Sequence, residues 1–292
     1  MRFSVVIPTL RREAILEATL ASLSECDPGP DEVIVIDADP EGSSRPVITT
    51  FDHQASPAVL YINSPPSLTV QRNRGIDEAS GDVIVFLDDD VSISPDLFAR
   101  LAETYGDPGI VGATGRVIEP EGGRRGGPRS IFRRLLPGGG REGTFTRYGY
   151  PRYLRELDRR RDVEFMRGCF MSARREDATK IRFDEHMGGY ALAEDEDFSF
   201  RLSRLGRIRY EPEIVVRHRK LGFGSQDARR FGRLVVVNRA YLFRKNFSRT
   251  PLARAQFAML VVLLVGHRLV NREWRGAQGL LEGALQVLRG RS

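Results

Sequence analysis

Four short runs rich in β-branched residues recur in the first third of the chain and constrain its fold more than any other feature. The runs are residues 4–7, 32–36, 58–62 and 82–87, at intervals of roughly 25 residues, which is the spacing of βαβ units. Between the first two runs lies one mostly apolar helical face, formed by Ile15, Leu16, Thr19, Leu20 and Leu23. The pattern therefore predicts an α/β fold with a parallel sheet.

Two more helices are predicted at 67–79 and 95–105. Ser94 is expected to cap the second helix, with Pro95 at its first helical position. The chain has 292 residues, 41% of them apolar, which is enough for one large domain or two ordinary ones. Its two cysteines, Cys26 and Cys169, are too few for a disulfide framework or a cysteine-based zinc site, so we expect reduced thiols in a cytosolic setting.

The C-terminal segment is strongly basic. Residues 227–292 hold 13 Arg and Lys against 3 Asp and Glu, whereas residues 1–226 carry a net charge of −4. Three helices are predicted there, at 227–247, 251–270 and 276–290. These helices are expected either to lie on an anionic membrane surface or to pack on the sheet or on a second copy of the chain. The uncharged stretch 255–267 has 13 residues, fewer than the ~20 that cross a bilayer, so a spanning helix is not expected.

Residues 120–149 differ in composition from their surroundings, with nine glycines, three prolines and seven arginines. Such a segment predicts a long loop, either mobile and functional or an insertion without a role. We therefore expect an α/β domain over 1–226, followed by a basic amphipathic helical region over 227–292. Within the domain, the loop 120–149 would separate a first half at about 1–118 from a second at about 150–226.

Polar residues follow three of the predicted strands. They are Pro8, Thr9, Asp37, Asp39, Asp88, Asp89 and Asp90. Ligands of parallel α/β sheets bind beyond the carboxyl ends of the strands, so these residues should converge at one edge. Three adjacent carboxylates repel one another unless a cation is near. Asp88 and Asp90 could together address one Mg²⁺ or Mn²⁺ that also holds phosphate oxygens, and the alternative is a solvated acidic turn.

A second acidic cluster occupies residues 194–197 at the start of a predicted helix. Negative charge is favoured there by the helix dipole, so the cluster is either a cap or a source of a general base for a substrate hydroxyl. His218 follows another strand and would complete a metal site, contact phosphate or be structural. Arg72 and Asn73, at the start of the third helix, would suit an anionic ligand unless Arg72 faces solvent.

Five motifs, in order, resemble those of glycosyltransferase family 2, the nucleotide-diphospho-sugar transferases with a GT-A fold. They are SVVIPTL, DEVIVIDAD, QRNRGIDEASGDVIVFLDDD, FDEHMGGYALAEDEDFSFRLSRLG and YEPEIVVRH, and they cover about residues 3–220. The resemblance implies a doubly wound, mostly parallel, Rossmann-like sheet with a C-terminal helical appendage. Residues 1–118 would then form the nucleotide-sugar half of a catalytic domain and residues 150–226 its acceptor half.

The resemblance also implies roles for single residues. The donor-binding residues would be Pro8, Thr9, Asp37, Asp39, Arg72, Asn73, Asp88, Asp89 and Gly168, with Asp37 or Asp39 reading the base and Gly168 near the donor sugar and acceptor. Asp90 would hold the metal, joined by Asp88 and His218. The register set by Arg201 and Leu202 makes Asp195 the expected base, with Glu194 as second choice.

A family 2 enzyme of this kind is expected to invert the anomeric centre by single displacement, with Mg²⁺ or Mn²⁺ as cofactor. The donor would be a UDP-, dTDP- or GDP-sugar, and the acceptor a glycan or lipid-linked intermediate of cell-surface polysaccharide or glycolipid synthesis. We expect the enzyme in the cytoplasm, at the inner face of the cell membrane, with a homodimer as a further expectation. The second strand ends in DADPEGSS rather than a DDGS-type turn, which leaves both Asp37 and Asp39 as candidates for contact with the base. No QXXRW-like motif follows the acidic cluster, and this absence disfavours a processive polymerase.

Two other classes fit the sequence less well. A sugar-1-phosphate nucleotidyltransferase would carry a glycine-rich loop after the first strand, but residues 8–12 contain no glycine. A non-catalytic nucleotide-sugar or nucleic-acid binding protein would account for the isoelectric point of 9.6 and the arginine-rich tail. The tail lacks interleaved stacking aromatics and the preceding domain is acidic, so no nucleic-acid partner is expected.

Overall fold

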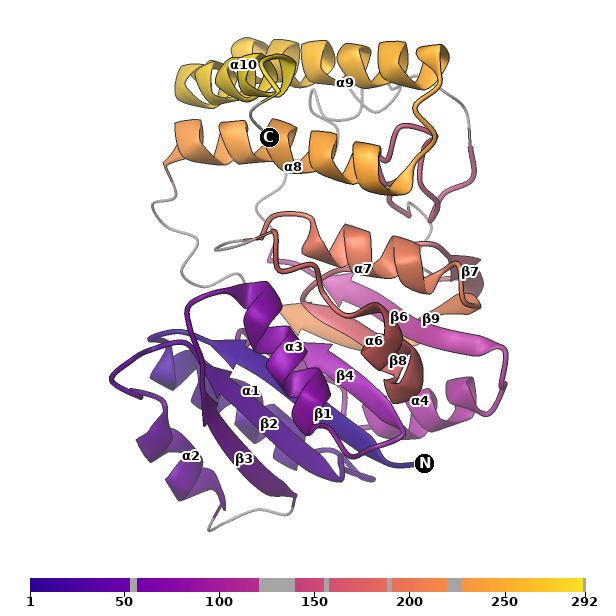
Figure 1. Ribbon diagram of the computed structural model, residues 1–292. Helices are drawn as coiled ribbons and strands as arrows, with labels where there is room; N and C mark the ends of the chain where they lie inside the picture. Colours follow the sequence, from indigo (N-terminus) through magenta and orange to yellow (C-terminus); the bar gives the residue numbers. More distant parts are fainter. Residues whose placement is uncertain (53–56, 121–139, 155–157, 188–190, 220–226, 291–292) are drawn as a thin grey trace. The chain divides into compact units, whose positions relative to one another are not determined.

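The structure, a computed structural model, describes residues 1–52, 57–120, 140–154, 158–187, 191–219 and 227–290 (Figure 1). The chain forms two compact units. The sheet unit comprises Met1–Pro120 and Leu154–Leu221, and the helical unit comprises Glu121–Tyr153 and Gly222–Ser292. Most of the predicted loop 120–149 lies outside the described residues. Its described end, from residue 140, belongs to the helical unit, whereas the sequence analysis grouped it with the sheet.

Nine strands of the described residues form one mixed sheet, in the order β3-β2-β1-β4-β8-β6-β9-β5, with β7 paired to β9. The strands are β1 (Phe3–Thr9), β2 (Glu32–Asp37), β3 (Ala58–Asn63), β4 (Val83–Leu87), β5 (Val91–Ile93), β6 (Ile110–Ile118), β7 (Arg161–Val163), β8 (Phe170–Arg174) and β9 (Arg207–His218). The first four are parallel, which confirms the predicted α/β fold. Antiparallel β8 joins β4 to β6, and β6 pairs with β9 in parallel.

Helices cover both faces of the sheet. They are α1 (Glu13–Ser24), α2 (Arg45–Asp52), α3 (Leu68–Glu78), α4 (Leu97–Tyr105), α6 (Arg175–Ile181) and α7 (Glu194–Leu202). Val5 and Ile7 of β1 belong to one hydrophobic core and Val6 to the other. A strand that is buried on both faces has an unbroken run of apolar residues, so these strands can be predicted from the sequence. Gly75 lets α3 approach β1, because a Cβ there would lie 2.2 Å from Val6 Cγ1.

One helix begins later than the sequence predicts. α4 starts at Leu97 with Asp96 at the N-cap position, not at Pro95 with Ser94 as cap. The backbone amide of Ser94 instead donates to the carbonyl of Val215, 3.2 Å away. This bond continues the pairing of β5 with β9. The backbone at Ser94 therefore remains part of the sheet, although Ser94 and Pro95 favour the start of a helix.

The helical unit contains α8 (Ala228–Asn246), α9 (Pro251–Val270) and α10 (Trp274–Leu288). Glycines let α8 and α10 pack closely. A Cβ on Gly232 would lie 2.4 Å from the carbonyl oxygen of Gly276, and one on Gly279 would lie 1.9 Å from that of Arg229. α9 packs through larger side chains, with Phe257 stacked on Phe243 of α8 at 5.2 Å between ring centroids.

Among the described residues, α9 is the one helix that is long and apolar enough to cross a membrane. It has 20 residues, a mean hydropathy of 1.4 in its most apolar window, and only 11% of that window is buried. The uncharged stretch 255–267 is too short to predict such a helix from the sequence. The flanking residues of α9 supply the additional length.

Candidate functional site

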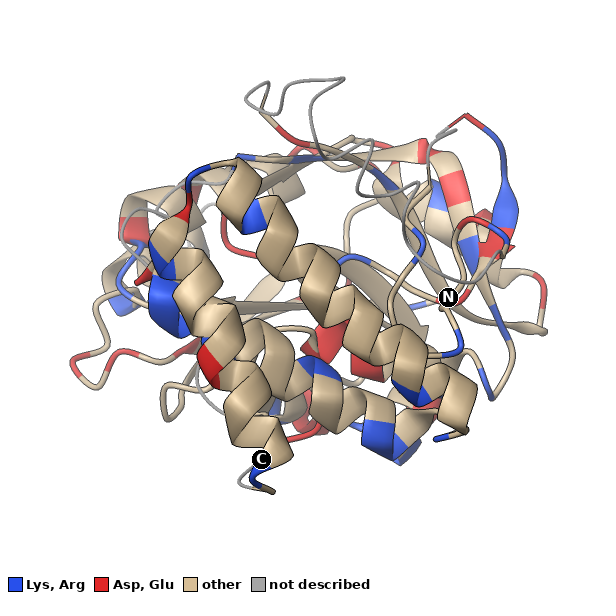
Figure 2. Cartoon of the chain, turned by 90° about the horizontal axis from the view of Figure 1, so that it is seen from above, with Lys and Arg blue, Asp and Glu red and all other residues tan. Residues whose placement is uncertain are grey.

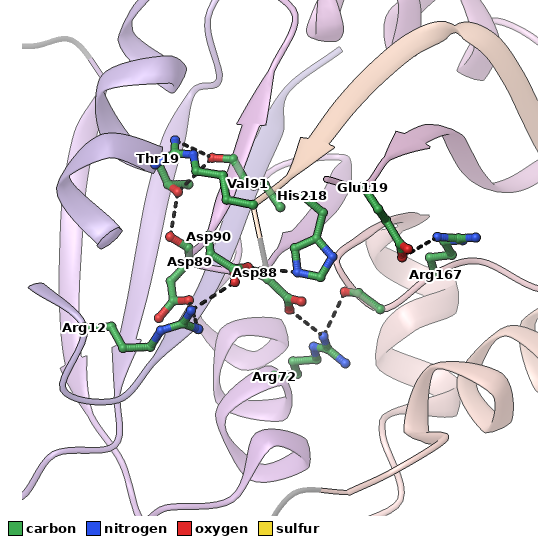
Figure 3. A network of polar contacts seen from close by, with 12 residues as sticks. Arg12, Thr19, Arg72, Asp88, Asp89, Asp90, Val91, Glu119, Arg167 and His218 are labelled. Atoms are coloured by element: carbon green, nitrogen blue, oxygen red, sulfur yellow. Dashed lines mark hydrogen bonds and ion pairs between the residues drawn. The ribbon is translucent and has the colours of Figure 1, made fainter. Parts of the chain in front are cut away.

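Three side chains at the sheet edge are placed to hold a divalent cation. Asp88 and Asp90 follow β4, and His218 ends β9. Each offers one ligand atom, and these atoms lie within 4.8 Å of one another (Figure 3). His218 Nε2 lies 3.0 Å from Asp90 Oδ1, while the Asp88 side chain is 30% exposed and leaves the group open to a ligand. Carboxylate oxygens are what Mg²⁺ and Mn²⁺ prefer, so the donor set fits either ion.

The middle carboxylate of the triplet is held by the protein itself. Asp89 accepts hydrogen bonds from Thr9 Oγ1 at 2.8 Å and from Arg12 Nη1 at 2.6 Å. Burial raises the pKa of Asp89 to about 7, and the Arg12 charge opposes that rise. Arg12 also donates to Asp90 Oδ2 at 2.9 Å. Although burial acts to raise the pKa of Asp90, contacts with His218 and Arg12 hold it below its ordinary value.

Arg72 of α3 links the acidic triplet to the second acidic cluster. This side chain is 1% exposed. Its Nη1 donates to Glu194 Oε1 at 2.7 Å, and its Nη2 donates to the carbonyl of Gly168 at 2.9 Å. The same Nη2 lies 3.3 Å from Asp88 Oδ1. Figure 3 shows the guanidinium directed toward Asp88. Arg72 therefore does not face solvent, which was the alternative prediction for this residue.

Glu194 and Asp195 open α7, directly after Ala193, whose backbone is left-handed (φ 72°). The two Asp195 oxygens accept from the backbone amides of Gly168, at 2.9 Å, and Glu196, at 2.8 Å. Burial raises the pKa of Glu194 to about 8, helped by the Asp195 charge and opposed by Arg72. Burial also raises the pKa of Asp195, against the Arg72 charge and these backbone hydrogen bonds. Glu194 is buried, whereas Asp195 remains partly exposed.

The two aspartates after β2 have different surroundings. Asp37 is fully buried, and its carboxylate accepts from the amides of Asp39 and Ser44 and from the Tyr61 hydroxyl, at 2.9, 3.2 and 3.1 Å. Asp39 pairs at 3.1 Å with Arg11, whose side chain is 64% exposed. Asp37 therefore holds the turn after β2, and Asp39 lies next to the exposed Arg11 side chain and also accepts from the amide of Glu41 at 3.4 Å.

The Asn73 side chain joins two segments of the sheet unit. Its Nδ2 donates to the carbonyl of Phe183 at 2.9 Å and to Glu185 Oε1 at 2.7 Å. Its Oδ1 accepts from the backbone amide of Phe183 at 2.8 Å. The amide group thus fastens the segment after α6 to α3, and the structure gives no contact between it and the acidic triplet among the described residues. Donor binding by Asn73 stays a prediction.

Sequence analysis missed three residues that support the site. Arg12 stands just beyond β1, and this position at the strand end was a usable signal. Thr19 was assigned to an apolar helix face, yet its hydroxyl lies 2.6 Å from the carbonyl oxygen of Asp89 and 2.9 Å from that of Val91. Gln71 Nε2 donates to the carbonyls of Thr9 and Ile36, at 3.0 and 2.7 Å, and ties the ends of β1 and β2 together. Nothing in the local sequence marks the last two contacts.

This arrangement of acidic groups at the edge of the sheet agrees with a family comparison. The family model for glycosyl transferase family 2 matches residues 4–182, which is more than half of the chain. The chain belongs to glycosyltransferase family 2. The resemblance inferred from the five ordered motifs is therefore confirmed.

Curated relatives of this family 2 member align with part of its length. The succinoglycan biosynthesis protein ExoM of Rhizobium meliloti is 31% identical over 120 residues, which are 40% of this chain and 39% of that protein. A GalNAc(5)-diNAcBac-PP-undecaprenol beta-1,3-glucosyltransferase of Campylobacter jejuni is 29% identical over 91 residues, 30% of this chain and 29% of that one. The aligned segment thus spans well under half of each relative.

The fold of this family 2 chain matches a solved glycosyltransferase. The mannosyltransferase PcManGT of Pyrobaculum calidifontis, solved in complex with GDP-Man and Mn²⁺, aligns with a TM-score of 0.63. The alignment covers 100% of this chain and 88% of that one, at 16% identity. The likeness shows that the sheet unit has the expected GT-A fold.

Proposed function

We propose that the protein is an inverting glycosyltransferase that moves a sugar from a nucleoside-diphosphate donor to an acceptor hydroxyl. The observation that carries this proposal is the position of Arg72, which contacts both Asp88 and Glu194. Asp88, a proposed ligand of the cation that would face the departing diphosphate, and Glu194, which directly precedes the proposed base Asp195, thereby contact the same guanidinium. Single displacement needs a group facing the leaving phosphate and a base at the same moment, because charge develops on the leaving phosphate as the nucleophile loses its proton.

Asp195 is proposed as the general base. It remains partly exposed, while Glu194 is buried and its carboxylate is committed to Arg72. As the acceptor oxygen forms its bond to the anomeric carbon, the bond to the diphosphate oxygen breaks and the hydroxyl proton passes to an Asp195 carboxylate oxygen. Attack from the face opposite the leaving group inverts the anomeric centre. A positioned base contributes roughly 10²–10⁴-fold to such a step.

Asp88, Asp90 and His218 would hold a divalent cation, Mg²⁺ or Mn²⁺. Such an ion, when bound, neutralises negative charge on the diphosphate. Arg12 lies against Asp89 and Asp90 and keeps both carboxylates in place next to this site. Thr9 fixes Asp89 from the end of β1. These contacts hold the triplet in one arrangement before any donor binds.

The donor pocket is proposed to lie at the carboxyl ends of β1, β2 and β4, lined by Pro8, Thr9, Arg72, Asp88, Asp89 and Gly168, with Asn73 behind them. We assign recognition of the nucleotide base to Asp39, because the carboxylate of Asp37 is committed to the turn after β2 and Asp39 pairs with the exposed Arg11. The donor is proposed to be a UDP-, dTDP- or GDP-sugar.

The acceptor is proposed to be a glycan or a lipid-linked intermediate in cell-surface polysaccharide or glycolipid synthesis. The name of the Campylobacter jejuni relative describes an undecaprenol-linked acceptor, and that of the Rhizobium meliloti relative describes succinoglycan biosynthesis. An enzyme of this kind would work in the cytoplasm at the inner face of the cell membrane. A homodimer remains the alternative use of residues 227–292.

A thermal-shift panel tests the proposal. UDP, dTDP, GDP and CDP are each added with and without Mn²⁺ to the wild type and to Asp90→Ala. Stabilisation grows with ligand concentration relative to the dissociation constant. We expect one nucleotide to raise the melting temperature only when both Mn²⁺ and Asp90 are present. If no nucleotide stabilises the wild type under any condition, the chain is not a nucleotide-sugar transferase.

A further inference from the structure

Most of the exposed large apolar side chains of the described residues lie on α9 and α10. Of the large hydrophobic side chains that are exposed, nine belong to these two helices: Leu252, Met259, Val262, Leu269, Val270, Trp274, Leu281, Leu285 and Leu288. The other four are single residues elsewhere, namely Met1, Leu10, Leu60 and Leu205. Scattered exposed leucines are ordinary in soluble proteins, but a concentration on adjoining helices indicates a binding surface. We call these nine side chains the α9–α10 face.

On α9, the face is a continuous stripe. Leu252, Met259, Val262 and Leu269 recur at intervals of seven and three positions, which places them on one side of the helix. The opposite side is also apolar, since Ala253 and Leu260 are buried in the core of the helical unit. A helix that is apolar all round belongs in a core or in contact with lipid. One side of α9 is buried in the core of the helical unit, and the opposite side is exposed.

On α10, Trp274, Leu281, Leu285 and Leu288 form a matching stripe with the same helical spacing. The inner side of α10 is made of small residues, including Gly276, Gly279 and Gly283, which are buried against α8. α10 also contacts α9. In Figure 2, α9 and α10 are tan over most of their length, and charged residues lie chiefly at the helix ends.

Arginines lie at both ends of α9 and at the start of α10. Arg254 lies in the first turn of α9, Arg268 in its last turn, and Arg272 and Arg275 flank the start of α10. The segment 227–292 carries 13 basic against 3 acidic residues. Trp274, 63% exposed, is the first residue of α10. An apolar stripe with arginines at the helix ends and a tryptophan at the start of α10 has the composition of helices that lie in the head-group region of anionic bilayers.

We propose that the α9–α10 face docks onto an anionic lipid bilayer with both helix axes in the membrane plane. The nine apolar side chains would enter the boundary between head groups and acyl chains, and Arg254 and Arg272 would contact lipid phosphates, since Arg268 pairs with Glu273 and Arg275 with Asp227. A second copy of the chain is a poorer occupant, because pairing this face with itself would bring two strongly basic segments together. A spanning α9 is also disfavoured, because its Phe257 and Leu260 are engaged in the unit's core and Glu282 lies on the neighbouring α10.

Docking would place the enzyme beside a lipid-linked acceptor, and to that extent the inference rests on the proposed function. Its test does not depend on turnover. Trp274 is the single tryptophan of the chain, so its fluorescence reports the environment of this face alone. The full-length protein is mixed with vesicles of phosphatidylcholine, with and without phosphatidylglycerol, and both Trp274 emission and cosedimentation are measured.

With anionic vesicles, we expect Trp274 emission to move to shorter wavelength and the protein to sediment with the lipid, less so at high salt. Val262→Glu/Leu281→Glu should weaken partitioning by more than about tenfold, since two apolar contacts with lipid are lost. Leu205→Glu, the same change at an exposed leucine of the sheet unit, should have no effect. Thermal shifts with nucleotide and Mn²⁺ show that each variant is folded.

Three results would overturn the inference. The first is no sedimentation with anionic vesicles by a folded protein. The second is a shift of Trp274 emission that depends on protein concentration without lipid, which identifies a dimer interface. The third is quenching of Trp274 mainly by lipids brominated near the bilayer centre, which indicates insertion deeper than the head-group boundary. If nucleotide still binds in these cases, the proposed function is not contradicted. If the protein binds vesicles but no nucleotide, the membrane-docking inference is supported and the proposed function is contradicted.

Discussion

Arg72 and Glu194, which are 122 positions apart in the sequence, share a buried hydrogen-bonded ion pair of 2.7 Å. Asp88 and the carbonyl of Gly168 complete the surroundings of the guanidinium. Removal of the arginine would leave the buried Glu194 carboxyl group without its hydrogen-bond donor and the nearby Asp88 and Asp195 without a cation, and the loss of one partner of a buried pair costs far more than an intact pair contributes. The pair therefore determines the stability of the site as well as its geometry.

Arg72→Met should lower the free energy of unfolding by about 3–5 kcal/mol. The measurement is urea denaturation followed by circular dichroism. Arg182→Met is the matched control, because Arg182 pairs with Asp77 at the surface, where both side chains are substantially exposed. Surface pairs contribute about 0–1 kcal/mol. An equal decrease in the free energy of unfolding in the two variants would show that the burial of Arg72 does not increase its contribution to stability.

Asp195→Asn should reduce kcat by roughly 10²–10⁴-fold and leave nucleotide affinity unchanged, because the proposed base acts only in the chemical step. Steady-state kinetics and calorimetry measure the two quantities. Transfer at the wild-type rate by this variant would assign the base elsewhere, with Glu194 as the next candidate.

The pH profile of kcat should show the raised pKa of Asp195. The base accepts a proton only when ionised, so the rate should fall as pH decreases through a pKa above the ordinary range of an aspartate. The residual activity of Asp195→Asn should lack this acidic limb. A wild-type rate that stays constant down to the ordinary aspartate pKa would contradict the assignment.

Glu194 should make stability depend on pH. Its pKa is raised from 4.5 to about 8, so the folded state binds its proton more tightly than the unfolded state. The resulting stabilisation is complete below about pH 4.5 and is lost as pH rises through about 8. Glu194→Gln, which cannot ionise, should lose less stability than the wild type between about pH 5 and about pH 9. Urea denaturation at several pH values measures this difference, and parallel curves for the two proteins would refute it.

Asp90→Asn should weaken Mn²⁺ binding by at least about tenfold, since even residues behind the metal ligands change affinity by roughly 10–100-fold. The electron paramagnetic resonance signal of free Mn²⁺ measures the affinity without any turnover. Asp96→Asn is the control, because Asp96 is a half-exposed acid that pairs with Arg100. If both variants bind Mn²⁺ like the wild type, Asp90 is not a ligand.

Much of this fold follows from the sequence because its strands are buried on both faces. The β-branched runs mark β1 to β4, and the rule that ligands bind beyond strand ends leads directly to Asp88 and Asp90. The three-residue strands β5 and β7 leave no comparable signal, because pairing with β9 creates them. The contacts of Arg72 with Glu194 and of Thr19 with Asp89 depend on which helix face meets which segment. That information lies in tertiary packing and not in local patterns.

β9 has a consequence for how the protein is made. It pairs with β5, β6 and β7, and its last residue, His218, belongs to the metal-binding group. A ribosome delivers Asp88 and Asp90 well over a hundred residues before this histidine. A nascent or truncated chain that stops before β9 therefore lacks both a strand that three others need and one ligand of the cation. On the proposed cation site, full affinity for the ion would therefore be acquired only when β9 has been made and the sheet is complete.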